Sequence, residues 1–304
     1  MSSLDVAASA LSRTSVLRGY WELTKPKVVA AIVFTAIVGM HLASAGRWPL
    51  ARMLTACVGI WLAAASAAAL NHVLDQRLDA AMARTRRRPL PSGQLNQRAA
   101  IVFALALGSV SISILALGVN MLTAALTLVS LIGYSVLYTA WLKPLTPQNI
   151  VIGGAAGAAP PVLGWAAIRN GIDAEALLLF LIILVWTPPH FWALAIARRG
   201  EYVRAGVPML PVTHGVAFTS DCIVIYSALL AIITLLPFLS GMCGALYLVG
   251  SSALNIVFVR QGFRLRACPT PAIAMRAFRF SIQYLLLLFA LLLIDHYLRG
   301  RHAR

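Results

Sequence analysis

Three polar residues spaced four apart, Asn71, Asp75 and Asp79, are conspicuous in a chain in which only 11% of the residues are charged. On a helix such residues line one face, with neighbouring side chains about 6 Å apart. Two carboxylates at that distance repel each other unless a cation lies between them. Mg²⁺ prefers oxygen ligands and is commonly held by one or two carboxylates together with phosphate oxygens. The spacing therefore predicts a Mg²⁺ site, with the carbonyl oxygen of Asn71 as a further ligand.

A group of arginines follows the aspartates in the stretch RTRRRPL, which contains Arg84, Arg86, Arg87 and Arg88. The planar guanidinium group suits phosphate oxygens, to which it can donate two hydrogen bonds at once. Acid, metal, phosphate and arginine would then form a charge-balanced site at a membrane surface, suited to a ligand with a diphosphate head and a lipid tail. The alternative is that the arginines only orient the protein in the membrane and that the aspartates pair with them. For the arginines alone we favour that alternative, whereas the spacing of the aspartates favours the ligand site.

Two further loops carry residues that could face the same ligand. The stretch ARRGEYVRAGVPMLPVTHG contains Glu201 between Arg199 and Arg204, and the stretch WLKPLTPQNIVIGG contains Lys143 at the expected membrane edge. A single carboxylate in a basic loop is usually a solvated ion pair. Because both loops are expected on the same side of the membrane as Asp75, we predict that Glu201 joins the metal site. We also predict that Lys143 and Arg204 bind the diphosphate.

His190 is a polar residue within an otherwise apolar stretch, WTPPHFW, which runs from Trp186 to Trp192. Polar side chains are costly inside a membrane and are therefore candidates for function. The histidine could form a hydrogen bond between two helices, or it could contact a substrate that lies between the flat rings of Trp186 and Trp192. The sequence leaves both readings open. The proline pair that precedes His190 predicts a break in its helix that would make room for a ligand.

These residues are carried by long apolar runs, and 60% of the 304 residues are hydrophobic. A charge-free run of about 18 residues can cross the hydrocarbon core of a bilayer as a helix. Eight such runs are present, with a shorter ninth around 280–294: 28–45, 53–70, 99–119, 121–142, 150–168, 176–197, 222–240 and 241–259. Backbone polar groups must be satisfied inside lipid, and the runs lack the alternation of barrel strands. The predicted fold class is an all-α polytopic membrane protein with nine transmembrane helices in a single bundle.

The net charge of +16 is distributed unevenly over the loops. With nine spans, 19 of the 25 lysines and arginines lie on the side of the N-terminus. The positive-inside rule then places the N-terminus in the cytoplasm and the C-terminus outside, in a membrane that we interpret as a bacterial plasma (inner) membrane. This orientation signal accounts for the basic charge without nucleic acid as a partner. We expect one domain over residues 1–304, with a cytoplasmic tail at residues 1–24.

Four stretches together resemble the intramembrane prenyltransferases of the ubiquinone-biosynthesis type, and among them the protoheme IX farnesyltransferases (haem O synthases). NHVLDQRLDAAMARTRRRPLPSG is similar to the first Asp-rich motif of that group, and TPQNIVIGGAAGAAPPVLGW, WTPPHFWALA and EYVRAGVPMLPV are similar to its other characteristic stretches. The resemblance runs in order from about Trp21 to Gly215. The Asp-rich motif identifies the superfamily, whereas the PPHFW and AGVPMLP sequences narrow the resemblance to the haem-specific group.

The resemblance implies nine helices around a central cavity and transfer of a farnesyl group from farnesyl diphosphate to a vinyl group of haem b. Addition of water would complete the reaction and give haem O for terminal oxidases. The implied cofactor is Mg²⁺, and the implied partners are farnesyl diphosphate, haem b, the lipid bilayer and downstream haem-modifying or oxidase-assembly proteins. The predicted site residues are, for catalysis, Asp75, Asp79 and Arg84; for diphosphate binding, Arg84, Arg87, Arg88, Lys143 and Arg204; for the metal, Asn71, Asp75, Asp79 and Glu201; and for haem, His190, Trp186 and Trp192.

The chain departs from the group's pattern at two places. Relatives commonly carry acidic residues at the positions of both Gly200 and Glu201, so only one carboxylate is left here for a second metal. Basic residues often follow the lysine that corresponds to Lys143, whereas Pro144 and Leu145 follow it here. The second half of the predicted diphosphate site therefore has fewer charges than the first.

Two other functions remain open on the sequence. One is prenyl transfer to a different aromatic or tetrapyrrole acceptor, which the Asp-rich motif alone does not distinguish from transfer to haem. The other is transport of an anionic lipid, since broken helices and intramembrane histidines also occur in transporters. Against transport, the halves of the chain show no visible repeat, and the polar residues gather toward one face of the membrane.

Overall fold

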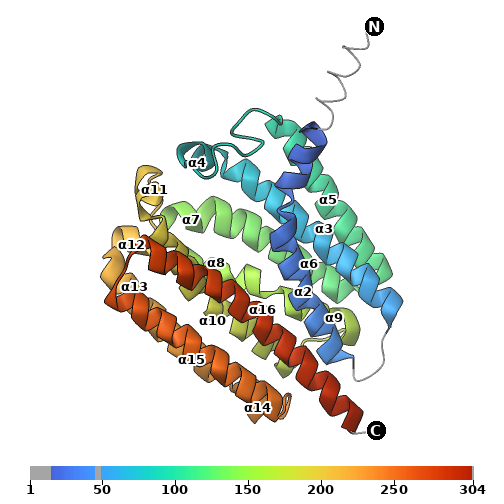
Figure 1. The fold of residues 1–304 in the computed structure, drawn as a ribbon. Helices are drawn as coiled ribbons and strands as arrows, with labels where there is room; N and C mark the ends of the chain where they lie inside the picture. The colour runs from blue at the N-terminus through green and yellow to red at the C-terminus, as the bar shows by residue number, and fades with distance from the viewer. Residues whose placement is uncertain (1–14, 45–48, 303–304) are drawn as a thin grey trace, which may run out of the picture.

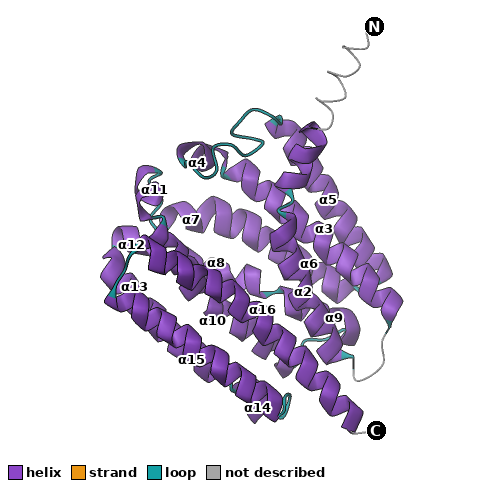
Figure 2. Cartoon of the chain, in the orientation of Figure 1, coloured by secondary structure: helices purple, strands orange, loops and turns teal. Residues whose placement is uncertain are grey.

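The computed structural model describes residues 15–44 and 49–302, and all regular structure in these two ranges is helical (Figures 1 and 2). Most of the helices are long and lie side by side in one bundle. The short helices α4 (Gln76–Ala81), α11 (Arg199–Arg204) and α12 (Leu210–Thr213) gather at one end of the bundle, and α14 (Leu236–Leu239) lies at the other (Figure 1). The predicted all-α fold is confirmed.

The long helices form nine rods in the described ranges, some of them built from consecutive helices. They are α2 (Pro26–Ala43); α3 (Leu50–Leu74); α5 (Gln97–Gly118); α6 (Met121–Ile132), η1 (Gly133–Leu142) and α7 (Lys143–Leu145); α8 (Asn149–Ala158) and α9 (Pro160–Arg169); α10 (Ala174–Ala197); α13 (Gly215–Ile233) and α14; α15 (Ala245–Ala267); and α16 (Pro271–His302).

Eight of these rods in the described part of the chain are long and apolar enough to cross a membrane. The remaining rod, α15, corresponds to the predicted span at 241–259. Polar residues such as Asn255, Arg260 and Gln261 lower its hydropathy. Helix α15 nevertheless packs along α13 and α16. The number of candidate spans is therefore one fewer than predicted, although nine rods are present.

A buried hydrogen-bond network ties α15 to its two neighbours. The hydroxyl of Tyr284 donates to Oδ1 of Asn255 (2.7 Å), and Nδ2 of Asn255 donates to Oγ1 of Thr234 (2.8 Å). Asp295, which is buried on α16, accepts a hydrogen bond from the backbone N–H of Gly244 (2.6 Å) at the start of α15. Because each buried polar group has a partner, the network stabilises α13, α15 and α16 as a unit.

Helices α2 and α9 cross at very short range, because each has a glycine at the contact. A Cβ atom on Gly39 would lie 2.2 Å from the carbonyl oxygen of Pro161, and one on Gly164 would lie 2.0 Å from that of Ala36. Small residues allow such close approach of helix backbones in membranes. This crossing positions α2, whose first residue follows Lys25 of the site described below.

Local structure differs from the sequence-based expectation at two places. Residues 15–23, predicted to be part of a tail, are helical, and Tyr20 and Leu23 pack in an apolar cluster with Leu90 and Leu95. The expected break at Pro188–Pro189 is absent, since α10 continues through both prolines. The hydroxyl of Thr187, immediately before the prolines, donates to the carbonyl oxygen of Ile183 (2.7 Å).

Candidate active site

The three predicted metal ligands lie together where α3 passes into α4. Asn71 is in the last turn of α3, Asp75 is the residue between the two helices, and Asp79 is in α4. The backbone N–H of Asp75 bonds to the carbonyl oxygen of Asn71 (2.9 Å), and that of Asp79 bonds to that of Asp75 (2.8 Å). Helical spacing is therefore kept across the junction. All three side chains are buried, each with an exposed fraction of 5%.

Three cations contact these three side chains. Nζ of Lys143 lies 2.5 Å from Oδ2 of Asp75, and Nη1 of Arg88 lies 2.7 Å from Oδ2 of Asp79. Nζ of Lys25 donates to Oδ1 of Asn71 at 2.5 Å. Carboxylates and cations this close are stabilised by charge-assisted hydrogen bonds. The cluster of these six side chains holds more positive than negative charge, which suits an additional anion.

A π-helix positions Lys143 in this cluster. In η1 the backbone N–H of Lys143 bonds to the carbonyl oxygen of Tyr138, five residues earlier. The side chain of Thr139 likewise donates to the carbonyl oxygen of Tyr134 (2.8 Å) and accepts a long hydrogen bond from Asn71 (3.4 Å). Wide turns of this kind are rare and occur frequently at functional sites. Here the wide turn directs Thr139 and Lys143 toward α3.

The loop after α4 directs one arginine inward and the others outward. The buried hydroxyl of Thr85 donates to the carbonyl oxygen of Asp79 (2.9 Å), which folds the loop back over α4. In this fold Arg88 reaches Asp79, whereas the side chains of Arg84 and Arg87 are exposed. Of the predicted phosphate ligands in this loop, only Arg88 therefore belongs to the buried cluster.

Lys25 is the member of the cluster that sequence reasoning did not place in the site. It adopts a left-handed conformation (φ 47°) immediately before Pro26, where it caps the start of α2. Burial, together with the nearby charge of Arg88, lowers the pKa of Lys25 to about 8. A lysine followed by proline at the start of the first span was a signal that could have indicated this role. From the sequence, Lys25 is one of the 19 basic residues that orient the protein in the membrane.

Glu201 lies on α11 and does not contact the two aspartates. Its carboxylate pairs with Arg198 (3.1 Å). Within the described residues no group of three or more His, Cys, Asp or Glu side chains is arranged to hold a metal. Burial raises the pKa of the neighbouring Tyr202, and the charges of Glu201 and Asp75 also raise it, whereas the charge of Arg84 lowers it. The assignment of Glu201 as a metal ligand stays a prediction, as does that of the exposed Arg204.

His190 lies deep between α10 and α16 with partners of its own. Its Nδ1 atom lies 2.6 Å from the hydroxyl of Ser281, and its ring stacks on Trp186 (centroids 4.3 Å apart) and on Phe278 (4.6 Å). Trp186 also donates from Nε1 to the carbonyl oxygen of Ser281 (2.8 Å). Trp192 is buried on another side of α10 and contacts Tyr226 edge-on. The two tryptophans therefore do not form facing walls around His190.

The Asn71–Asp75–Asp79 set fits Mg²⁺. It supplies hard oxygen donors from two carboxylates and one amide, too few to complete six-fold coordination without phosphate oxygens or water. The surrounding cations Lys25, Arg88 and Lys143 would neutralise such phosphates. A buried acid–amide set inside a ring of cations, at the end of a bundle of helices long enough to span a membrane, suits an intramembrane protein that binds a metal-associated diphosphate.

Comparison with known proteins specifies the class. Residues 32–293 match the UbiA prenyltransferase family, and the chain belongs to that family. A protoheme IX farnesyltransferase of Shewanella denitrificans is 53% identical over 297 residues, which cover 98% of this chain and 99% of that protein. The chain is thus a multi-pass prenyltransferase that is similar over nearly its whole length to enzymes with that name.

Solved structures share the fold. A structure of digeranylgeranylglyceryl phosphate synthase superposes with a TM-score of 0.77 at 19% identity, covering 92% of this chain and 98% of that one. A UbiA homologue from Archaeoglobus fulgidus bound to DMAPP and Mg²⁺ superposes with a TM-score of 0.62 at 17% identity, covering 90% and 98%. At such identities the likeness establishes the helical architecture and no more.

Proposed function

We propose that the protein transfers the farnesyl group of farnesyl diphosphate to a vinyl group of haem b, with addition of water, and so forms haem O. The observation that carries this proposal is the cluster of Asn71, Asp75 and Asp79 under Lys25, Arg88 and Lys143. Membership of the prenyltransferase family and the similarity to protoheme IX farnesyltransferases support the reaction and its acceptor.

Asp75 and Asp79 would hold Mg²⁺, with the amide oxygen of Asn71 as a third protein ligand. When bound, the ion supplies charge stabilisation to the departing diphosphate. In the structure Lys143 and Arg88 each occupy one carboxylate oxygen, and Lys25 occupies the amide oxygen. We infer that these cations exchange those oxygens for phosphate oxygens when the diphosphate enters. The Asp75 and Asp79 carboxylates are then available to the metal.

The protein's own cations stabilise the negative charge that develops on the leaving diphosphate. The bond between the first farnesyl carbon and the diphosphate oxygen breaks, and both electrons leave with the diphosphate. Arg88 and Lys143 already lie beside the carboxylates that would hold the ion. Once they have exchanged these oxygens for phosphate oxygens, they would stabilise the charge that develops on the diphosphate. The exposed Arg84, Arg87 and Arg204 would close over the phosphates from the loops.

The vinyl group of haem b is the acceptor of the farnesyl group. The π electrons of the haem vinyl group form a bond to the first farnesyl carbon, which leaves a cation on the vinyl carbon next to the porphyrin. Water adds to that carbon and loses one proton, giving a hydroxyethylfarnesyl side chain, and free diphosphate is the second product.

The proposed reaction is tested with the purified protein in detergent. Farnesyl diphosphate, Mg²⁺ and haem b are incubated with it, the porphyrin products are separated, and their masses are determined by mass spectrometry. We expect a product that has the mass of haem b plus one farnesyl group and one hydroxyl group, formed together with free diphosphate. Diphosphate release that depends on another aromatic acceptor, with haem b unchanged, would contradict the choice of haem as acceptor.

His190 provides a prediction about the haem site, which rests on the proposed function. If His190 contacts haem, His190→Ala weakens haem binding and leaves binding of farnesyl diphosphate nearly intact, because the diphosphate site is on other helices. If its bond to Ser281 is its only role, the variant loses about 1 kcal/mol of stability or less and both ligands are affected alike. Titration of the haem absorbance of wild type and variant distinguishes the two roles.

Ser281→Ala is a matched control for His190→Ala. Ser281→Ala removes the partner of Nδ1 and keeps the imidazole ring in place between Trp186 and Phe278. The haem-contact role predicts that only His190→Ala weakens haem binding. Equal haem affinities in wild type and both variants would leave His190 with a packing role alone.

We further propose that residues 1–304 form one domain in a bacterial inner membrane, with the N-terminus and the Asp75 cluster on the cytoplasmic side. A reporter enzyme that is active only in the cytoplasm should give a strong signal when inserted at Ser92 and none when fused after residue 304. The reason is that nine crossings separate the two ends of the chain. A strong signal from the C-terminal fusion would mean an even number of crossings, with α15 failing to span.

A further inference from the structure

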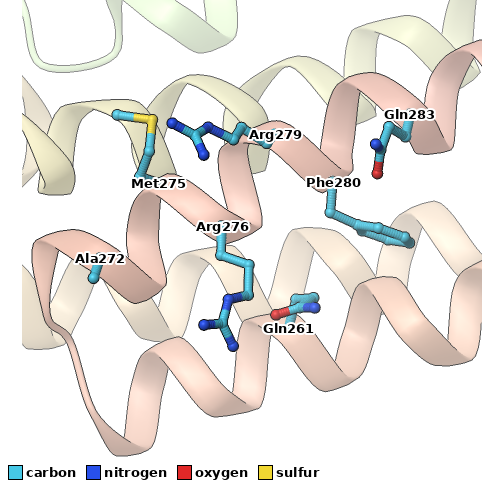
Figure 3. A pocket seen from close by; sticks show the side chains of 7 residues that line it. All are labelled: Gln261, Ala272, Met275, Arg276, Arg279, Phe280 and Gln283. Atoms are coloured by element: carbon cyan, nitrogen blue, oxygen red, sulfur yellow. The ribbon is translucent and has the colours of Figure 1, made fainter.

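A groove lies between α15 and α16, near the turn at 268–270 that joins the two helices. Its volume is about 500 Å³. Helix α16 supplies most of its lining and α15 supplies Gln261 (Figure 3). Helix α15 packs mainly on α13 and α16 and makes no comparable contact with α3 in the described chain. None of the residues that line the groove belongs to the aspartate cluster.

Positive charge in this groove has no neutralising partner within the described ranges 15–44 and 49–302. Arg276 and Arg279 both line it, and the lining contains no acidic residue. Neither arginine has an ion pair or hydrogen bond with any residue that the structure describes, whereas Arg266 nearby pairs with Asp221 (Nε to Oδ1, 2.6 Å). Two guanidinium groups are thus available to an anion from outside the chain.

Two glutamines in the groove also need partners. The Oε1 atom of Gln261 is buried and has no hydrogen-bond partner among the described residues. A buried polar atom without a hydrogen-bond partner destabilises the folded protein. Gln283 is exposed one turn beyond Arg279, toward the middle of the membrane, where a polar side chain that faces lipid is costly. A polar group from a ligand that enters the bilayer would satisfy both amides.

Helix α16 presents apolar side chains next to the arginines. Arg279 lies about 12 Å along α16 from its first residue, at 1.5 Å per residue, and the charge-free run begins at Phe280. Phe280 lines the groove, and Ile282 and Leu286 are exposed further along α16. A lipid bound here would place an anionic head group at the arginines and its acyl chains along this surface.

We propose that the groove binds the head group of phosphatidylglycerol, an anionic phospholipid, from the leaflet on the side of the active site. The phosphodiester accepts hydrogen bonds from the guanidinium forks of Arg276 and Arg279. The glycerol hydroxyls both donate and accept, so they satisfy the amides of Gln261 and Gln283. A haem propionate offers no donor for Gln261. Basic pockets between transmembrane helices are suited to anionic lipid head groups in this way.

The proposal is tested by native mass spectrometry of the purified protein released from a mild detergent. Equal, limiting amounts of phosphatidylglycerol and phosphatidylcholine are added, and the lipid that stays bound is identified. We expect wild type to retain phosphatidylglycerol selectively. The double variant Arg276→Gln, Arg279→Gln should bind it about thirtyfold more weakly, since each basic residue near an anionic surface contributes about 1 kcal/mol. Arg260→Gln, an exposed arginine on α15 outside the groove, is the matched control and should bind like wild type.

Thermal unfolding in the same detergent supplies an independent measurement, because a ligand that binds the folded state raises the unfolding midpoint. Phosphatidylglycerol should raise the midpoint of wild type and Arg260→Gln but not that of the double variant, and all three should unfold alike in phosphatidylcholine. Undiminished retention of phosphatidylglycerol by the double variant would overturn the proposal. So would displacement of the lipid by inorganic phosphate at equal concentration, or a double variant that loses haem b binding instead.

Discussion

Asp75→Asn and Asp79→Asn are each expected to lower farnesyl transfer by about a hundredfold to a thousandfold, the range for removal of one preorganised group that stabilises charge in a transition state. Both substitutions keep the shape of the side chain and remove its charge. Each also removes the negative partner of a cation, Lys143 for Asp75 and Arg88 for Asp79. The measurement is the initial rate of haem O formation at saturating Mg²⁺ and farnesyl diphosphate.

Asp221→Asn is the control for this pair of variants. Asp221 makes the same kind of carboxylate–arginine contact, to Arg266, but its side chain is about half exposed and it lies outside the cluster. We expect nearly normal turnover in this variant, since exposed ion pairs contribute little.

Folding of the two active-site variants is checked separately from activity. Asp75→Asn leaves Lys143 without its carboxylate, so the combined variant Asp75→Asn, Lys143→Met tests whether any loss of stability comes from that unpaired charge. The combined variant should recover the unfolding midpoint but not the activity. Near-normal turnover of both single variants at saturating Mg²⁺ would exclude the two aspartates as metal ligands.

Gly39→Ala and Gly164→Ala are expected to be strongly destabilising. The added methyl group would lie 2.2 Å from the carbonyl oxygen of Pro161 in the first variant and 2.0 Å from that of Ala36 in the second. The obstacle in both is helix backbone, which cannot rotate away as a side chain can, so α2 and α9 must move apart. Overpacking of this kind costs about 1–3 kcal/mol or more. The measurement is the unfolding midpoint in detergent, together with the yield of monodisperse protein.

The same two variants connect packing to catalysis. Because Lys25 caps the start of α2, a shift of α2 also moves Lys25 away from Asn71, and activity should fall with stability. Gly157→Ala is the matched control, since a Cβ atom there meets nothing within 4 Å, and it should be neutral or slightly stabilising. If Gly39→Ala and Gly164→Ala unfold like Gly157→Ala, the close crossing of α2 and α9 is not required for the fold.

The sequence alone was sufficient to predict the features that depend on local periodicity, namely the helices and the residues that share one helix face. Apolar runs longer than a bilayer core require helices, because lipid offers no hydrogen bonds to the backbone. The four-residue spacing of Asn71, Asp75 and Asp79 places them on one face through backbone bonds between neighbouring turns, and the structure keeps those bonds. The polar α15 shows the limit of this reasoning, since hydropathy alone does not decide whether a helix packed against two others crosses the membrane.

Tertiary structure decided which cations meet these carboxylates. Lys143 is 68 residues from Asp75 in sequence and Lys25 is 46 from Asn71, and their contacts depend on how η1 and α2 pack beside α3. Of the four arginines between residues 84 and 88, Arg88 is the one that pairs with Asp79, and this depends on how the loop folds. The wide turn of η1 has no periodic signature in the sequence, so the direction of Lys143 was not predictable.

The partners of His190 were decided in the same way. The sequence placed it between Trp186 and Trp192, but an α-helix points residues 186 and 190 to one side and residue 192 to another. The ring therefore stacks on Trp186 and on Phe278, and it bonds to Ser281, which is 91 residues away. Spacing along a helix determines which side chains share a face, whereas only the packing of helices determines what that face meets.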